Sequence, residues 1–467
     1  MSLALSVLSF VAGVQLSVAA SVVVGVAAAG VLALRRPTMV FALLVLVGAL
    51  RGGQVAQAWH AVRQLDGQAT KLAATVREVE ERATRSSVAL DVHGIGRHAV
   101  GVGGVTLWLF VRESVQRGQR LTVSCPWTVR ERPSVLVPSA PSLTCDNPII
   151  DAREPAHPVV ALLDRGRQRF VRAVQTALPE PAASLAIGLT LGETRTFDAQ
   201  IVEDFRVSGT SHVLALSGYN VSVLVAVLVA TVPALVGRRP AFALILVALA
   251  AFLILTGVPP SLLRASVMGA LLIVARWIGR RATAARLLGL SVIGLVAVEP
   301  GLMADLGFLL SVVATLGLIL AADRLAPPKR LPGFIRNIVG SSTAAFVFTL
   351  PILVPLFHRL SPVAPLANLL VLPLVPVLFF GSAGVGVLAL VAPNLAAVVG
   401  TPVVWLSNAF LGLIAWIARL PFASLTLDLP NPLPWIFPAA VLIAALVWRE
   451  RPCAICTCPV RPAPWQP

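Results

Sequence analysis

The chain has 467 residues, of which 57% are hydrophobic and only 12% are charged, and its mean hydropathy is +0.87. Soluble domains are about 45–50% apolar and about 25% charged, so this composition excludes a soluble globular enzyme and a disordered chain. A polytopic α-helical membrane protein remains. The net charge of +16 indicates either a nucleic-acid or anionic-lipid partner, or only basic cytoplasmic loops.

The first membrane helices are predicted within residues 1–50. Residues 3–34 carry no charge and fit a tight pair of short helices, and residues 38–50 form a third apolar segment. Because no cationic residue precedes them, we expect no cleavable signal peptide.

Residues 51–156 contain much of the charge and are predicted to form a small OB-like β domain outside the membrane. Strand-like runs at 88–92, 105–111 and 121–124 are separated by glycine and polar turns. Cys125 and Cys145 are the only cysteines of this domain. Outside the cytoplasm they could form a disulfide that closes a loop of roughly 20 residues, worth about 3 kcal/mol; the alternative is two unpaired thiols.

Residues 157–210 are predicted to form amphipathic helices at the membrane surface. The first, at 160–178, is basic. The second runs from Thr196 to Val207, with Thr196 as N-cap and Gly209 as its stop.

Residues 211–449 are predicted to form the transmembrane channel domain, followed by a cytoplasmic tail at 450–467. The predicted spans are 212–236, 241–256, 262–278, 286–298, 303–321, 337–357, 366–392, 395–419 and 434–449. With the N-terminal helices, the sequence predicts about twelve membrane segments. Prolines crowd residues 351–376, and such broken or re-entrant helices are tolerated only inside protein or beside a watery cavity. They indicate either a transport pathway or kinked, inert helices.

Alternation of these spans places most basic loop residues on one side, where only Asp323 and Glu450 are acidic. The positive-inside rule makes that side cytoplasmic. We therefore expect both termini in the cytoplasm and the β domain outside the cell membrane. Most of the basic excess then reflects topology, and any outer contact to DNA requires local clusters such as Arg165, Arg167, Arg169 and Arg172.

Polar residues at membrane depth are costly and are therefore functional candidates. His212, Ser217, Tyr219 and Asn220 enter one apolar helix together. The Ser217-Gly218 pair is expected to unwind this helix locally and expose backbone groups. The alternative role for these residues is hydrogen bonding between helices.

A second cluster combines a break at Gly257 and Pro260 with Arg264 in the first turn of the next helix. Such a helix start favours an anion. Arg264 is expected either to contact a phosphate or to pair with Asp305 or Glu299. A third cluster runs from His358 to Asn368, where an outer loop enters the proline-broken region.

Four segments, in this order, resemble the ComEC/Rec2 family of competence DNA-uptake channels. The matching segments are Gly209–Val221, Leu255–Ala265, Glu299–Ser311 and Ala364–Leu374. Gly188–Thr194, which contains Glu193, resembles a further family segment. The layout of the first 156 residues resembles the family's N-terminal arrangement.

The resemblance implies a cell-membrane channel that passes single-stranded DNA into the cytoplasm. Residues of the implied DNA path are Glu193, His212, Ser217, Gly218, Tyr219, Asn220, Gly257, Pro260, Arg264, Asp305, His358 and Asn368. Trp108, Phe110 and Trp127 could stack bases or pack in the core of the outer domain. The implied partners are single-stranded DNA, the lipid bilayer and a separate nuclease, DNA receptor and cytoplasmic motor, with homo-oligomerisation left open.

We expect no enzymatic activity, cofactor, metal or catalytic residue, because the histidines do not form the ligand pattern of a metallo-β-lactamase-like nuclease. Two alternatives come from other functional classes. A secondary transporter of a small solute would also have broken helices with polar clusters. An intramembrane serine protease would use Ser217 as nucleophile and His358 as base.

Overall fold

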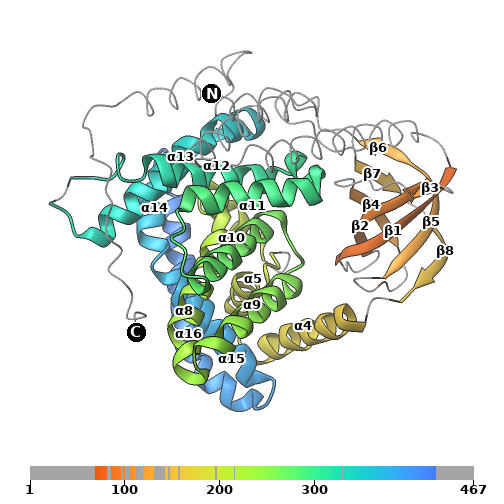
Figure 1. The fold of residues 1–467 in the computed structure, drawn as a ribbon, viewed down its shortest axis with the longest axis horizontal. Helices are drawn as coiled ribbons and strands as arrows, with labels where there is room; N and C mark the ends of the chain where they lie inside the picture. The colour runs from red at the N-terminus through yellow and green to blue at the C-terminus, as the bar shows by residue number, and fades with distance from the viewer. Residues whose placement is uncertain are drawn as a thin grey trace.

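The computed structural model describes most of the chain after residue 68. The described residues are 69–80, 86–95, 98–99, 106–111, 115, 119–130, 142–145, 148–155, 158–194, 197–214, 216–328 and 330–426. The predicted helices within 1–50, the predicted span at 434–449 and the tail at 450–467 lie outside them. Figure 1 shows a β domain beside a larger helical body, with helix α4 leading from one to the other.

The β domain is a single mixed sheet whose pairing order is β6-β7-β4-β2-β1-β5-β8, with β3 on β2. Its strands are β1 (Ala69–Glu80), β2 (Ser86–Ile95), β3 (His98–Ala99), β4 (Thr106–Val111), β5 (Arg120–Pro126), β6 (Thr128–Arg130), β7 (Ser142–Cys145) and β8 (Ile149–Glu154). Strands β4 and β7 are parallel, and the other paired strands are antiparallel.

One nearly continuous strand links β6, at one end of this pairing path, to β5, the strand next to its other end. Only Trp127 separates β5, which pairs with β1, from β6, which pairs with β7. The sheet must therefore curl into a barrel. Trp127 itself is fully buried, with 0% of its surface exposed, so it packs in the core and is not available to stack bases.

The helical body is built from helices α4 to α16. They are α4 (Pro158–Ala177), α5 (Ala182–Leu191), α6 (Ala199–Val207), α7 (Ser211–Leu214), α8 (Gly218–Val236), α9 (Arg238–Leu255), α10 (Pro260–Trp277), α11 (Ala284–Val298), α12 (Leu306–Ala321), α13 (Gly333–Phe357), α14 (Ala364–Val371), α15 (Leu374–Ala389) and α16 (Pro393–Ala418). A 3-10 helix, η1 (Pro300–Ala304), precedes α12, and a short hairpin pairs β9 (Arg359–Leu360) with β10 (Leu425–Thr426).

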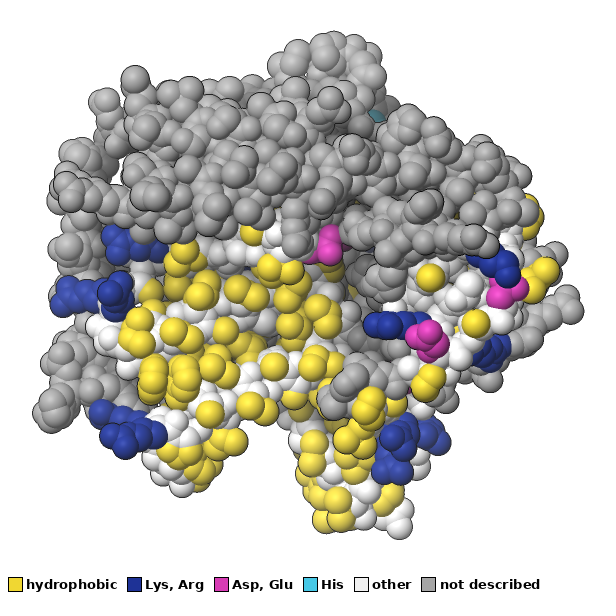
Figure 2. Space-filling view, turned by 45° about the vertical axis from the view of Figure 1, so that its right-hand side comes forward, with side chains coloured by type: hydrophobic (Ala, Val, Ile, Leu, Met, Phe, Trp, Pro, Cys, Tyr) yellow, Lys and Arg dark blue, Asp and Glu magenta, His cyan; other side chains and the backbone are white. Residues whose placement is uncertain are grey.

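Within the described part, five helices are long and apolar enough to cross a membrane, or six if the bent pair α14 and α15 forms one span. The two helices of that pair meet at 47°. Helices α5, α11 and α12 are apolar but shorter. Large apolar side chains remain exposed, among them Leu235 at 81% and Val391 at 85%, and Figure 2 shows apolar atoms gathered over the helical face. The chain is a multi-pass membrane protein; the count of about twelve segments stays a prediction.

One sequence-based helix boundary differs in the structure. The second amphipathic helix, α6, begins at Ala199 because the carboxylate of Asp198 accepts a hydrogen bond from the Gln200 amide at 3.0 Å. The prediction of Thr196 as N-cap is therefore wrong. The apolar stripe of α6 is also more enclosed than a surface helix requires, since Phe205 is buried against Phe410 of α16.

Close helix contacts depend on glycine at specific positions. A Cβ added at Gly317 of α12 would lie 2.7 Å from the Ala344 carbonyl oxygen and 2.8 Å from the Phe348 ring of α13. A Cβ at Gly386 of α15 would overlap the Phe170 ring of α4. These glycines let helix backbones approach each other, as small residues do in membrane bundles.

Candidate functional site

The predicted span at 212–236 is two helices with a break between them. Helix α7 ends at Leu214 and α8 begins at Gly218, after Ser217 in an extended conformation. The Ser217 side chain makes no capping bond. The amide N–H groups of Gly218 and Tyr219 meet no acceptor among the described residues, so the start of α8 presents free donors.

Hydroxyl groups stabilise the corner between α6 and α7, which precedes this break. Ser208 and Thr210 share a 2.7 Å hydrogen bond between their buried hydroxyls, and Ser211 donates to the Phe205 carbonyl at 3.2 Å. A Cβ at Gly209, whose φ is +74°, would lie 2.6 Å from Cβ of Ala364. The corner therefore packs tightly against the start of α14.

Arg264 of α10 lies beside the first turn of α8. Only 4% of its surface is exposed. Its Nε donates to the Ser311 hydroxyl of α12 at 2.9 Å, and Nη1 lies 3.6 Å from Sδ of Met268. A Cβ built on Gly218 would lie 3.3 Å from Nη2, so the guanidinium reaches the start of α8.

The loop before α10 carries backbone strain. Gly257 has φ +93° and Val258 has φ +55°. A β-branched residue with positive φ is an outlier that costs about 1–3 kcal/mol, and such strain concentrates at functional sites. Pro260 then starts α10, where its missing N–H costs nothing, and Arg264 follows one turn later.

Asp305 has a structural partner of its own. Its Oδ1 accepts from the Phe308 amide at 2.7 Å and caps α12. Within the described residues Arg264 makes no ion pair with Asp305, and its bond goes to Ser311 instead. Of the alternatives for Arg264, pairing with Asp305 is therefore wrong.

Tyr219 connects the start of α8 to the break between α14 and α15. Its hydroxyl donates to the Leu372 carbonyl at 3.3 Å. In a continuous helix that carbonyl would accept from residue 376, but residue 376 is proline and has no N–H. Tyr219 thus satisfies an acceptor that Pro376 leaves unpaired.

Two buried amides near these segments have unsatisfied atoms. Asn220 of α8 has no partner for Nδ2, and Asn368 of α14 has none for Oδ1, among the residues that the structure describes. Unpaired buried polar atoms are costly and rare, so these two groups are available to a ligand or to water.

The other residues predicted for the DNA path lie outside the contacts made by Arg264 and Tyr219. Glu193 forms an ion pair with Arg167 of α4 at 3.1 Å, and the adjacent Gly192 packs against Leu216. His212 and His358 are exposed, and His358 ends α13 with φ +50°. No hydrogen bond joins Ser217 to His358 in the described part of the chain.

An ion network holds α6 to the hairpin that follows His358. Nη1 of Arg359 lies 2.7 Å from Oε1 of Glu203, and Nη1 of Arg206 lies 2.6 Å from Oε2. The bond from Arg359, followed by that from Arg206, lowers the pKa of Glu203 below its ordinary value of 4.5. Ser361 adds hydrogen bonds with the carbonyls of Val207 and Ala423.

All four segments that resemble family motifs therefore meet. The first touches the second through Gly218 and Arg264, and it touches the fourth through Tyr219 and Leu372. The second touches the third through Arg264 and Ser311. From sequence alone, Ser311 and Met268 were not identified as partners of Arg264. Ser311 is the last residue of the third motif, and this position was the one indication that it could have a role.

A sequence profile of the family described as competence protein matches residues 189–452, more than half of the chain. The chain belongs to the competence protein family. The prediction of a ComEC/Rec2-type protein is thereby confirmed. ComE operon protein 3 of Bacillus subtilis (strain 168) is 27% identical over 294 residues, which are 61% of this chain and 37% of that relative. The chain thus matches little more than a third of the relative's length. No solved structure matches.

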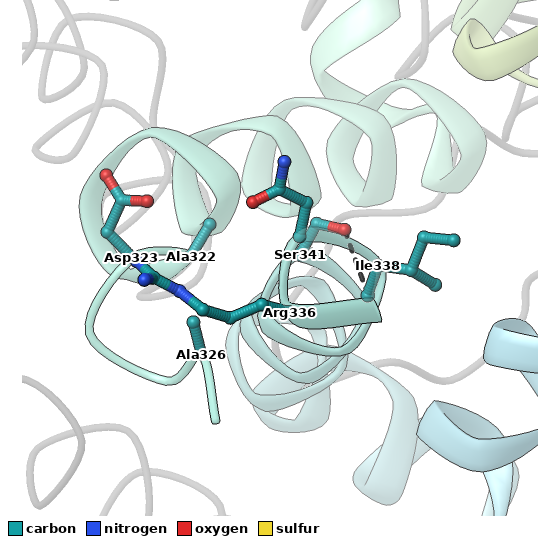
Figure 3. A pocket seen from close by; sticks show the side chains of 7 residues that line it. Ala322, Asp323, Ala326, Arg336, Ile338 and Ser341 are labelled. Atoms are coloured by element: carbon teal, nitrogen blue, oxygen red, sulfur yellow. Dashed lines mark hydrogen bonds between the residues drawn. The ribbon is translucent and has the colours of Figure 1, made fainter. Parts of the chain in front are cut away.

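A pocket of about 400 Å³ lies away from the meeting point of the four motifs. It lies between the end of α12 and the start of α13 and is lined by Ala322, Asp323, Ala326, Arg336, Asn337, Ile338 and Ser341 (Figure 3). Arg336 has a buried Nε without a partner among the described residues. The facing carboxylate of Asp323 makes this pocket less suited to an anion than the surroundings of Arg264.

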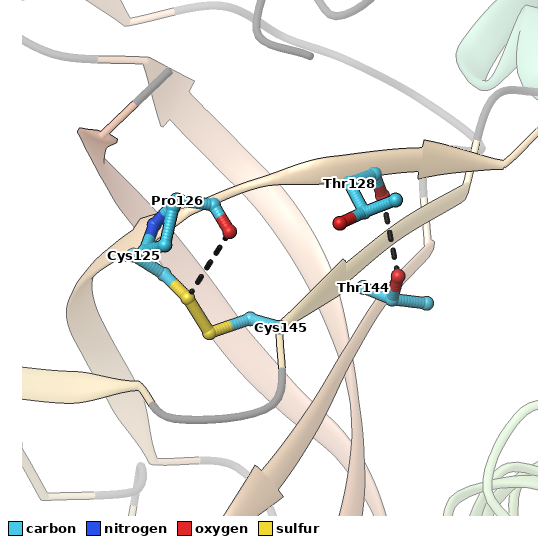
Figure 4. The surroundings of a disulfide bond; sticks show 5 residues. All are labelled: Cys125, Pro126, Thr128, Thr144 and Cys145. Carbon is cyan, nitrogen blue, oxygen red and sulfur yellow. Dashed lines mark hydrogen bonds between the residues drawn. A yellow bond between two sulfur atoms is a disulfide. The ribbon is translucent and has the colours of Figure 1, made fainter. Parts of the chain in front are cut away.

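In the β domain, the structure joins Cys125 and Cys145 in a disulfide (Figure 4). The bond ties the end of β5 to the end of β7, with 6.3 Å between the Cα atoms. The neighbouring hydroxyl of Thr144 donates to the Thr128 carbonyl at 3.3 Å. The disulfide thus fastens the parallel strand β7 to the strand that closes the barrel.

Proposed function

We propose that this chain is a channel of the cell membrane that passes single-stranded DNA into the cytoplasm during natural transformation. One observation carries the proposal. The four segments that resemble the competence family come together around the buried Arg264 and the free first turn of α8. The meeting of four segments that each resemble a family motif supports a shared functional site.

The chemistry of this meeting point suits a polyanion in transit. Positive charge and free amide groups attract phosphates, and a path for a moving strand needs contacts that hold each phosphate only weakly. One arginine and one helix start supply local attraction without a continuous basic surface.

We propose that the meeting point faces the outside of the cell. The opposite helix ends carry Arg238 and Arg239 at the start of α9 and Arg276 near the end of α10. The positive-inside rule makes those ends cytoplasmic. The start of α8 and the start of α10, at the other end of these antiparallel helices, then face outward, with the β domain on the same side.

We propose that the β domain is an OB-like platform for single strands. Its strand pairing supports this. Strand β1 pairs with β2 and β5, β4 runs parallel to β7, and the β5–β6 strand closes the barrel. OB barrels are five-stranded Greek-key barrels that bind oligonucleotides. The exposed Arg165, Arg169 and Arg172 of α4 follow the barrel in sequence.

Energy and strand degradation are proposed to come from separate partners: a cytoplasmic motor, a nuclease and a DNA receptor. The chain itself is proposed to have no enzymatic activity. The Ser217→Ala variant tests the protease alternative, because a protease would lose its function and a channel would keep it.

The deciding experiment is deletion of the gene followed by separate measurement of DNA binding at the cell surface and DNA internalisation. We expect binding to persist and internalisation to stop. Internalisation that survives the deletion contradicts the proposal. Reconstituted vesicles test the transporter alternative, since flux of a small solute without DNA would contradict a DNA channel.

A further inference from the structure

We propose that Arg264 and the first turn of α8 form a binding subsite for one phosphodiester group of a polynucleotide strand. The inference rests on the proposed transport function and adds to it the chemical group that is recognised and the residues that recognise it. Three features of the described residues carry it: a buried cation without a counter-ion, an uncapped helix start, and the glycine that lies between them.

The buried cation is Arg264, of which 96% is removed from solvent. Its hydrogen-bond partners are neutral: the hydroxyl of Ser311 and the thioether of Met268. No carboxylate forms an ion pair with it in the part of the chain that the structure describes. Burying a charge without a partner is strongly unfavourable, and intramembrane charges mark functional sites. The positive charge of Arg264 is therefore not balanced by a carboxylate of the described residues.

The helix start of α8 has no side-chain cap, like those of α5, α9, α10 and α13 to α16, whereas α6, α11 and α12 are capped by a side chain. On α12 the Asp305 carboxylate accepts from the Phe308 amide at 2.7 Å, and on α6 the Asp198 carboxylate accepts from Gln200 at 3.0 Å. On α8 the corresponding residue is Ser217, whose hydroxyl makes no capping bond. The positive end of the α8 dipole thus has no anionic group of its own.

Gly218 brings the two features together. Its absent Cβ would lie 3.3 Å from Nη2 of Arg264 and 3.3 Å from Cβ of Ala265. Any side chain at this position would crowd the guanidinium. With glycine at this position, Nη2 lies beside the amide groups of Gly218 and Tyr219. Two oxygens of one phosphate can then contact the guanidinium and these amides.

The subsite is reachable although Arg264 is buried. Ser217 and Gly218 are partly exposed, and Tyr219 is 38% exposed. The Nε end of the guanidinium is fixed by Ser311, so its Nη2 end is preorganised toward the exposed turn. A single fixed arginine and two amides form a short, charge-assisted contact with one phosphate and none with a base.

The test uses the full chain in nanodiscs of zwitterionic phospholipid, with a short fluorescent oligothymidylate as probe. We expect Arg264→Gln to weaken binding about tenfold, as loss of one charge-assisted contact does. The slope of log affinity against log salt concentration should fall by about 0.7, the value for one phosphate on a single strand. An oligonucleotide with uncharged methylphosphonate linkages should bind the wild type weakly and show no difference for Arg264→Gln.

The matched control is Arg276→Gln. It makes the same charge change on the same helix, at the opposite end, where Arg276 is exposed. We expect it to bind the probe as the wild type does. Equal binding by Arg264→Gln and wild type, or equal losses for Arg264→Gln and Arg276→Gln, would overturn the subsite.

A second variant keeps the proposal testable if Arg264→Gln fails to fold. Gly218→Val retains the charge and the Ser311 bond but fills the space beside Nη2, and we expect it to weaken binding as well. Wild-type binding by a folded Gly218→Val protein would overturn the subsite.

Failure of the subsite and failure of the proposed function give different results. If deletion of the gene stops internalisation but Arg264→Gln binds and internalises DNA normally, only the subsite is wrong. If internalisation does not need the gene, the proposed function is wrong.

Discussion

The Tyr219 hydroxyl lies 3.3 Å from the Leu372 carbonyl oxygen, although the two residues are 153 positions apart. Pro376 cannot supply the amide that would pair with this carbonyl in a continuous helix. One side chain from the start of α8 therefore stabilises the bend between α14 and α15. The two broken parts of the helical body are linked at their breaks.

Tyr219→Phe removes this donor and leaves the Leu372 carbonyl unpaired. We expect the free energy of unfolding to fall by about 0.5–1.5 kcal/mol, measured by thermal unfolding in detergent. Because the substitution leaves Arg264 and the backbone amides of the first turn of α8 unchanged, oligothymidylate binding should stay at the wild-type level. Loss of binding without loss of stability would mean that the hydroxyl itself contacts DNA.

The ion pair between Arg359 and Glu203 should make stability depend on acid pH. The lowered pKa of Glu203 means that the pair stabilises the folded state at neutral pH, and that this contribution disappears as pH falls below the ordinary carboxyl value of 4.5. We expect Glu203→Gln to reduce stability at neutral pH by about 0.2–1 kcal/mol, because both groups are exposed.

The difference between Glu203→Gln and wild type should shrink towards about pH 4, as followed by thermal unfolding. Arg359→Gln should behave in the same way. Arg419→Gln is the control: it removes an exposed arginine for which the structure describes no carboxylate partner. A difference that stays constant with pH would show that the pair does not act through the charge of Glu203.

Alanine at two glycines should have opposite effects. Gly317→Ala would place a Cβ 2.7 Å from the Ala344 carbonyl oxygen, and separating α12 from α13 should cost about 1–3 kcal/mol. Gly294→Ala on α11 meets no atom within 4 Å and should stabilise by about 1 kcal/mol through helix propensity. Thermal unfolding of the two variants side by side checks both signs; equal effects would contradict the close packing of α12 and α13.

Removal of the disulfide should destabilise the β domain. Cys125 and Cys145 are separated by 20 positions, and the chain-entropy model gives about 3 kcal/mol for a loop of this size. We expect the Cys125→Ser, Cys145→Ser double variant to be cleaved faster within residues 69–154 by a protease added to the intact protein. Reductant should speed cleavage of the wild type and leave the double variant unchanged.

Sequence pattern was sufficient for the membrane class and for most helices. The apolar runs at 241–256, 262–278 and 395–419 correspond to α9, α10 and α16 within a few residues. The Ser217-Gly218 pair correctly indicated a local break, because serine and glycine both disfavour continuation of an apolar helix. The Asp198 cap was missed because Thr196, two residues earlier, is an equally good capping residue by type.

Pairings between distant segments were beyond the sequence. Arg264 had two acidic residues as plausible partners, and nothing in the spacing indicated that Asp305 would turn inward to cap α12 and leave Arg264 to Ser311. The parallel pairing of β4 with β7 likewise depends on how the whole sheet curls. Such contacts are fixed by packing in three dimensions, which a local pattern does not encode.

The missing Cβ of Gly386 has a mechanical consequence. It allows the Phe170 ring of α4 to press directly on the backbone of α15, and α4 follows the last barrel strand, β8, after a short connection. A rotation of the barrel would therefore displace α4. Helix α4 packs on α15, whose first turn contains Pro376, and also on α5, α9 and α16. A displacement of the β domain would thus reach the helix that begins at this bend through α4.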